Sequence, residues 1–73
     1  MTLSKTERIL SILNFFLPHE DLYQYHFEAD SIAYITRKNS SLKTVEKVVR
    51  ECLGEAVDEE MIVPMAQAIK QAL

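Results

Sequence analysis

Residues 22–37, LYQYHFEADSIAYITR, decide the fold class of this chain, because the stretch fits two different elements. As a β-hairpin, Tyr23, Tyr25 and Phe27 alternate with their neighbours at period two, and residues of these types favour strands. Residues 28–31 would form the turn, and the return arm would continue the alternation. The turn has no Gly or Asn, which turns longer than two residues tolerate.

As a helix, the same stretch brings apolar side chains together at helical spacing, but only in part. Tyr23, Phe27 and Tyr34 then fall on a second face and Ile35 on a third, so the apolar residues spread around the helix, while the strand pattern is regular on the first arm. The sequence favours the hairpin and leaves the helix as the alternative. The residues that would share the helical face are Leu22, Tyr25, Ala29, Ile32 and Ala33.

A first helix precedes this stretch. Ser4 is a suitable N-cap and Glu7 completes a capping box, while Pro18 ends the helix. The apolar side chains of residues 9–17 spread over an arc of roughly 220° at about 100° per residue, wider than the stripe that a surface helix needs. We therefore expect this helix to be covered on two sides, within the domain or across a homodimer interface. The interface candidates are Ile12, Phe15 and Phe16.

Two further helices follow. Leu42, Val45, Val48, Val49 and Cys52 repeat at three and four residues, and Gly54 is a natural stop. The last segment places a second apolar stripe along residues 65–73, with Pro64 suited to a first helical turn. We therefore expect the helix to be broken or kinked near residues 63–64.

These elements predict an α+β fold, a single small domain over residues 1–73 in the order helix–β-hairpin–helix–helix. The helices would pack on one face of the sheet. The alternative is an all-α helix-turn-helix bundle. A chain of 73 residues buries only about 60% of its unfolded surface, so association with a partner would supplement its core.

Composition argues against three classes of protein: disulfide-bonded, metal-binding and membrane-spanning. Cys52 is the one cysteine, so there is no intrachain disulfide, and this favours a reducing, cytoplasmic setting. His19 and His26 lack the spacing of a metal site, so no metal is expected. The apolar run at residues 9–17 is shorter than the roughly 20 residues that span a bilayer, so no membrane partner is expected.

Charge is segregated along the chain. Eight basic and eleven acidic residues give a net charge of −3, which argues against general nucleic-acid binding. Residues 51–60 contain five acidic side chains and no basic one. The segment before them is basic and could dock onto phosphates or onto an acidic partner. Its candidate binding residues are Arg37, Lys38, Lys43, Lys47 and Arg50.

One local resemblance supports the all-α alternative. The segment SSLKTVEKVVRECLG, residues 40–54, resembles the recognition helix of LuxR-type helix-turn-helix regulators. IAYI, residues 32–35, would stand in for the preceding scanning helix. The resemblance implies that Lys43, Lys47 and Arg50 face DNA. RKNSS occupies the connection, where that family has a shorter turn.

No catalytic set is recognisable, so we expect neither an enzyme nor a cofactor. No Ser or Cys nucleophile has an assigned base, and a single glycine leaves no phosphate-binding loop. The function we expect is a small cytoplasmic regulatory or inhibitory binding module that docks to a protein partner or forms a homodimer. The alternative is a DNA-binding transcriptional regulator that uses the helix at 41–53.

Overall fold

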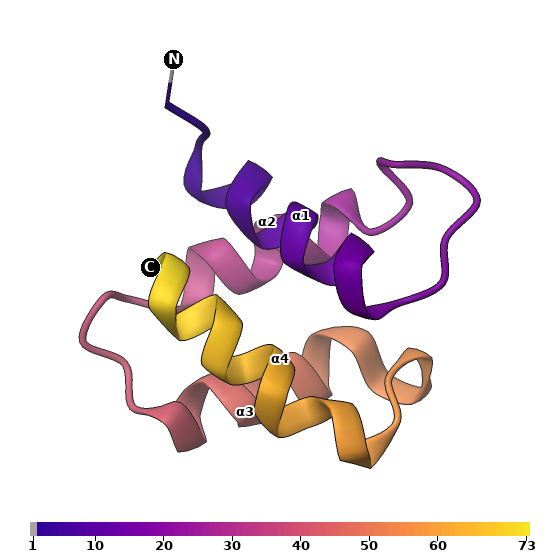
Figure 1. Cartoon of the computed structure of the whole chain (residues 1–73). Coiled ribbons are helices and arrows are strands. Elements are labelled where there is room, and N and C mark those ends of the chain that lie inside the picture. Colours follow the sequence, from indigo (N-terminus) through magenta and orange to yellow (C-terminus); the bar gives the residue numbers. More distant parts are fainter. Residues whose placement is uncertain (1) are drawn as a thin grey trace.

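The computed structural model describes residues 2–73, which form four α-helices and one short 3-10 helix (Figure 1). The chain folds as two helical hairpins that lie against each other, α1–α2 and α3–α4. The connection from α1 to α2 lies at one end, on the right in Figure 1, and the connection from α2 to α3 lies at the other. The elements are α1 (Lys5–Phe16), α2 (His26–Ile35), α3 (Leu42–Leu53), η1 (Gly54–Ala56) and α4 (Glu59–Ala72).

The helices form a closed ring around one hydrophobic core. α1 packs against α2 and α4, and α3 packs against the same two helices. Burial of each large core side chain stabilises the fold by roughly 1.5–3 kcal/mol. Each of the four α-helices contributes a side chain with at most 1% exposure, and the largest are Ile9, Leu13, Ile32, Val45, Val49, Ile62, Met65 and Ile69.

The predicted β-hairpin is wrong, because residues 26–35 form α2 and the described part of the chain, residues 2–73, contains no strand. Tyr25 is buried, whereas Tyr23 and Phe27 are exposed, so the three alternating aromatics share no face. The buried face is helical instead and includes Ala29 and Ile32. The all-α alternative therefore describes the fold class.

The first helix begins and ends as predicted. The Ser4 hydroxyl accepts from the Glu7 backbone N–H, and the Glu7 carboxylate accepts from the Ser4 N–H, which completes the capping box. The helix ends at Phe16, before Pro18. The Tyr25 hydroxyl donates to the Pro18 carbonyl at 2.5 Å and fixes the following connection to the bundle.

Gly54 ends α3 as the sequence predicts. Its φ of 55° and ψ of −127° belong to a region that L side chains rarely adopt. An added Cβ would meet no atom within 4 Å, so only the backbone conformation requires glycine here. The turn at Gly54 starts the reversal of the chain that leads into α4.

The predicted break at residues 63–64 is wrong, because α4 runs continuously from Glu59 to Ala72. Pro64 has no N–H, so the Glu60 carbonyl has no helical donor. Both residues are exposed, and water can satisfy that carbonyl without loss of the helix.

Among residues 2–73, no helix has both the length and the apolar character to cross a bilayer.

Candidate functional site

The five predicted basic residues do not form one continuous surface. Arg37 lies just past the end of α2, and its Nη1 donates to the Tyr34 carbonyl at 2.6 Å and to the Thr36 carbonyl at 3.1 Å. A cation at these carbonyls complements the negative end of the helix dipole. Lys38 follows in the exposed connection. These two cations belong to the end of α2 and not to the face of α3.

The remaining three predicted basic residues, Lys43, Lys47 and Arg50, lie on α3, and an ion pair neutralises Arg50. The Arg50 guanidinium forms an ion pair with the Glu59 carboxylate of α4, the one ion pair within residues 2–73. The hydrogen bond to Glu59 raises the pKa of Arg50, and the bond from Arg50 lowers the pKa of Glu59. Lys43 and Lys47 are exposed. The polar face of α3 therefore offers two free lysines at most.

The fold gathers further cations that no sequence pattern indicated. Lys5 Nζ donates to the Thr36 carbonyl at 2.5 Å, and Lys70 Nζ donates to the Ser40 carbonyl at 2.6 Å. Arg8 Nε donates to the Ala72 carbonyl at 3.0 Å. Burial, Arg37 and Arg8 lower the pKa of Lys5. We call this region the basic end, and its residues are Lys5, Arg8, Arg37, Lys38, Lys43 and Lys70.

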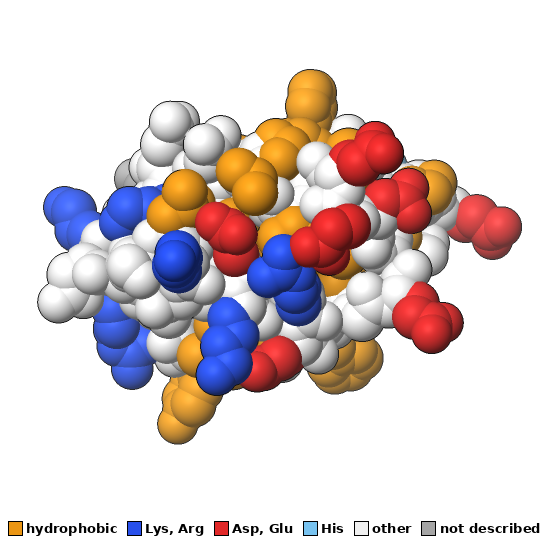
Figure 2. Space-filling model, turned by 90° about the horizontal axis from the view of Figure 1, so that it is seen from below, with side chains coloured by type: hydrophobic (Ala, Val, Ile, Leu, Met, Phe, Trp, Pro, Cys, Tyr) orange, Lys and Arg blue, Asp and Glu red, His pale blue; other side chains and the backbone are white. Residues whose placement is uncertain are grey.

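Acidic residues gather at the opposite end of the bundle. They come from the connection between α1 and α2, from the last turn of α3, from the turn between α3 and α4, and from the first turn of α4. Figure 2 shows blue side chains at the left and centre of one face and red ones at the centre and right. The bundle is therefore polarised along its length. We call this region the acidic end, and its residues are Glu20, Asp21, Glu51, Glu55, Asp58, Glu59 and Glu60.

The three predicted dimer-interface residues of α1 divide between core and surface. Ile12 and Phe16 are partly buried against the core. Phe15 is 82% exposed and meets the Phe16 ring edge-on, with a centroid distance of 5.2 Å. Most of the wide apolar arc is thus covered within the chain by α2 and α4, and Phe15 alone of the three is free for a partner.

The most exposed apolar surface on a single helix is on α2. Phe27 is 82% exposed and Tyr34 is 80% exposed. At about 100° per residue, they lie within roughly 20° of each other and opposite the buried Ala29. Ile35 is also exposed, to one side, and the small Ser31 lies between the two aromatics along the helix. We call Phe27, Ser31, Tyr34 and Ile35 the aromatic face of α2. This face was not proposed from the sequence as a binding surface, because the hairpin was preferred and the aromatic residues were assigned to strands.

The aromatic face of α2 adjoins the basic end. Arg37 reaches back to the Tyr34 carbonyl, so a guanidinium lies beside the last turn of the helix. Lys38 follows it directly. An apolar centre with charges at its border is the usual anatomy of a protein-binding surface, in which Tyr, Phe and Arg are enriched.

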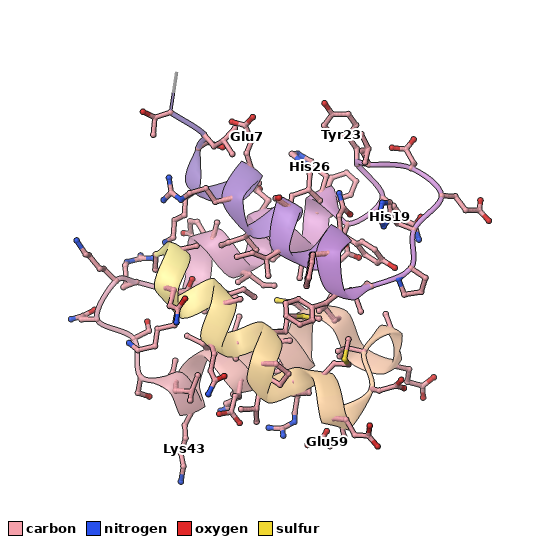
Figure 3. All side chains as sticks on the ribbon, in the orientation of Figure 1. Glu7, His19, Tyr23, His26, Lys43 and Glu59 are labelled. Carbon is pink, nitrogen blue, oxygen red and sulfur yellow. The ribbon has the colours of Figure 1, made fainter. Side chains whose placement is uncertain are left out.

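A second apolar surface lies on the α1 side. Leu22 and Tyr23 are 65% and 72% exposed and line a shallow groove with Leu3 and Leu10. The Asn14 side-chain amide donates to the Leu22 carbonyl at 2.8 Å and fixes the connection there. Figure 3 shows Tyr23, His26 and Glu7 along the same edge of the molecule, away from Lys43 and Glu59.

Two observations bear on chemistry in the described part of the chain: the placement of the possible metal ligands and the state of Cys52. Within residues 2–73, no three side chains of His, Cys, Asp or Glu come together in a way that could hold a metal ion. Burial, followed by the nearby Glu51 and Glu28, raises the pKa of the Cys52 thiol, which disfavours the nucleophilic thiolate.

No protein-family model, curated protein or solved structure matches this chain. The aromatic face of α2 and the two charged ends are therefore assigned from this chain's own residues.

Proposed function

We propose that this chain is a non-catalytic regulatory or inhibitory binding module that docks onto a protein partner through the aromatic face of α2. The observation that carries the proposal is the exposure of Phe27 and Tyr34, 82% and 80%, on a bundle whose core is otherwise closed. Two aromatic side chains that add nothing to the core, and that adjoin an arginine, are typical of binding hot spots.

Charge defines the partner that would fit. Arg37 and Lys38 border the aromatic face at one end of α2. A partner with an apolar patch and an acidic rim would bury the two rings and meet these cations. Rim charges of this kind mainly speed association, while buried aromatic side chains slow dissociation.

DNA binding through α3 is supported less well. A recognition helix needs several unpaired cations or side-chain amides that reach the base edges in the major groove and the neighbouring phosphates. Arg50 is held by Glu59, and the connection between α2 and α3 is six residues long, from Thr36 to Ser41. Glu46 also lies on this side of α3, between Lys43 and Lys47. A protein partner accounts for the exposed aromatics, which a DNA-binding α3 leaves unexplained.

The test is affinity capture from the native host with the tagged wild type and with a Phe27→Ser/Tyr34→Ser double variant. We expect the wild type to retain specific proteins, with or without nuclease, and the double variant to lose them. Circular dichroism of both chains verifies that the fold survives, because neither side chain contributes to the core.

A matched control uses the other face of the molecule. The Lys43→Glu/Lys47→Glu double variant changes α3 and leaves α2 intact, so it should retain the same proteins. Recovery of nuclease-sensitive material that the α3 variant loses and the α2 variant keeps would replace this proposal with the DNA-binding function.

A further inference from the structure

We infer that one partner of the aromatic face of α2 is a second copy of this chain, bound with the two α2 helices antiparallel. This inference rests on the proposed function. Phe27 and Tyr34 lie near opposite ends of α2. About a two-fold axis between Asp30 and Ser31, Phe27 of each copy comes level with Tyr34 of the other. The same contact then forms twice, as in an isologous interface.

The spacing along the helix suits this pairing. Phe27 and Tyr34 are seven residues apart, which corresponds to about 10 Å at 1.5 Å per residue. Ser31 lies between them and is small enough to let the two helices approach. Each Phe27 ring would then meet a Tyr34 ring across the axis, and aromatic pairs stabilise such contacts beyond simple burial.

The charged ends select the antiparallel orientation. The basic end lies at the end of α2 where the chain leads into α3, and the acidic end lies at its beginning (Figure 1). Antiparallel copies bring each basic end beside the acidic end of the other copy. Parallel copies would bring like charges together, which opposes association. Lys38 and Glu20, both exposed, lie in the connections that follow and precede α2, as do Arg37 and Asp21.

Asp30 opposes the pairing, and its position next to the proposed two-fold axis allows the axis to be tested. Asp30 is exposed on the edge of the aromatic face that leads toward α1, where its carboxylate accepts from the Thr6 hydroxyl at 3.1 Å. Close to a two-fold axis, Asp30 would meet Asp30 of the other copy. Removal of this like-charge contact should strengthen the dimer.

The test is sedimentation equilibrium of the untagged chain. A single-helix interface is small, so we expect a reversible dimer with a dissociation constant of roughly 10–500 μM. Phe27→Ala or Tyr34→Ala should weaken it at least about tenfold, because each change acts twice in the dimer. Phe15→Ala is the matched control, since Phe15 is also 82% exposed but lies on α1, and it should change nothing.

Charge variants test the orientation. Lys38→Glu or Glu20→Lys alone should weaken the dimer, and the two changes in one chain should restore it. Lys43→Glu, an equal change of charge at the basic end away from α2, should have a smaller effect. Asp30→Asn should strengthen the dimer, and added salt should weaken it.

A chain that remains monomeric throughout the range of roughly 10–500 μM would overturn the inference that a second copy is a partner. Dissociation by Phe15→Ala with no effect of Phe27→Ala would overturn it too and assign the interface to α1. Neither result changes the proposed function. That function fails if the Phe27→Ser/Tyr34→Ser variant captures the same host proteins as the wild type, or if the captured material is nuclease-sensitive and only the α3 variant loses it.

Discussion

Substitution of Ile32 and Tyr34, two residues apart on α2, should have very different effects on stability. Ile32 is 0% exposed and Tyr34 is 80% exposed. Ile32→Ala removes three buried carbon groups, about 2.4 kcal/mol at 0.8 kcal/mol per group. The cavity left behind raises the loss to about 3–4 kcal/mol, within the usual range for such changes. Tyr34→Ala removes almost no buried surface and should stay within about 0.5 kcal/mol.

The assay is urea unfolding monitored by far-ultraviolet circular dichroism. It is run at several protein concentrations, so that a loss of association in Tyr34→Ala is distinguished from a loss of stability within one chain. A domain of this size has a total stability of about 4–11 kcal/mol, so the loss at Ile32 should be a large share of the whole. In a hairpin, Ile32 and Tyr34 would lie on the same face of a strand. Similar losses for the two variants would therefore refute the helical assignment of residues 26–35.

Three further predictions concern single residues. Gly54→Ala should lower stability by about 1–3 kcal/mol through its positive φ, whereas D-alanine at this position in a synthetic chain should be tolerated; thermal unfolding measures both. Hydrogen bonds from Ser4 and Arg50 lower the pKa of the Glu7 and Glu59 carboxyls below their ordinary 4.5. Their stabilisation is therefore present above that pH and is lost as the pH falls through the folded pKa. The stability deficit of Glu7→Gln or Glu59→Gln, measured by urea unfolding, should be largest near neutral pH and vanish in acid; a deficit independent of pH would contradict this. Cys52, whose pKa is raised by burial, should react with iodoacetamide more slowly in the folded chain than in urea, and equal rates would show that the thiol is free.

Three local signals predicted element boundaries correctly, whereas Pro64 did not, because α4 continues through it. Ser4 with Glu7, Pro18 and Gly54 each act on neighbouring backbone groups, so their effect is decided within a few residues. The valine stripe of α3 is equally local, and its three valines are buried as predicted. Such signals required no knowledge of the tertiary contacts.

The errors arose where surface and core residues have the same chemical character. Phe27 and Tyr34 are apolar or aromatic but lie outside the core, so a pattern that assigns such residues to one buried face fails on α2. The basic end is a different case, because Lys5 and Lys70 come from opposite ends of the chain and meet only in the folded bundle. The ion pair of Arg50 likewise depends on the reversal at Gly54.

Photo-crosslinking in the native host with p-benzoylphenylalanine at position 34 shows directly whether α2 contacts a protein. The same probe at Gln67, exposed on α4, is the control. We expect discrete protein adducts from position 34 and none from position 67. One adduct from position 34 should have twice the chain mass of 8.4 kDa. Equal labelling from both positions, or adducts with nucleic acid alone, would contradict the assignment of α2 as a protein-binding surface.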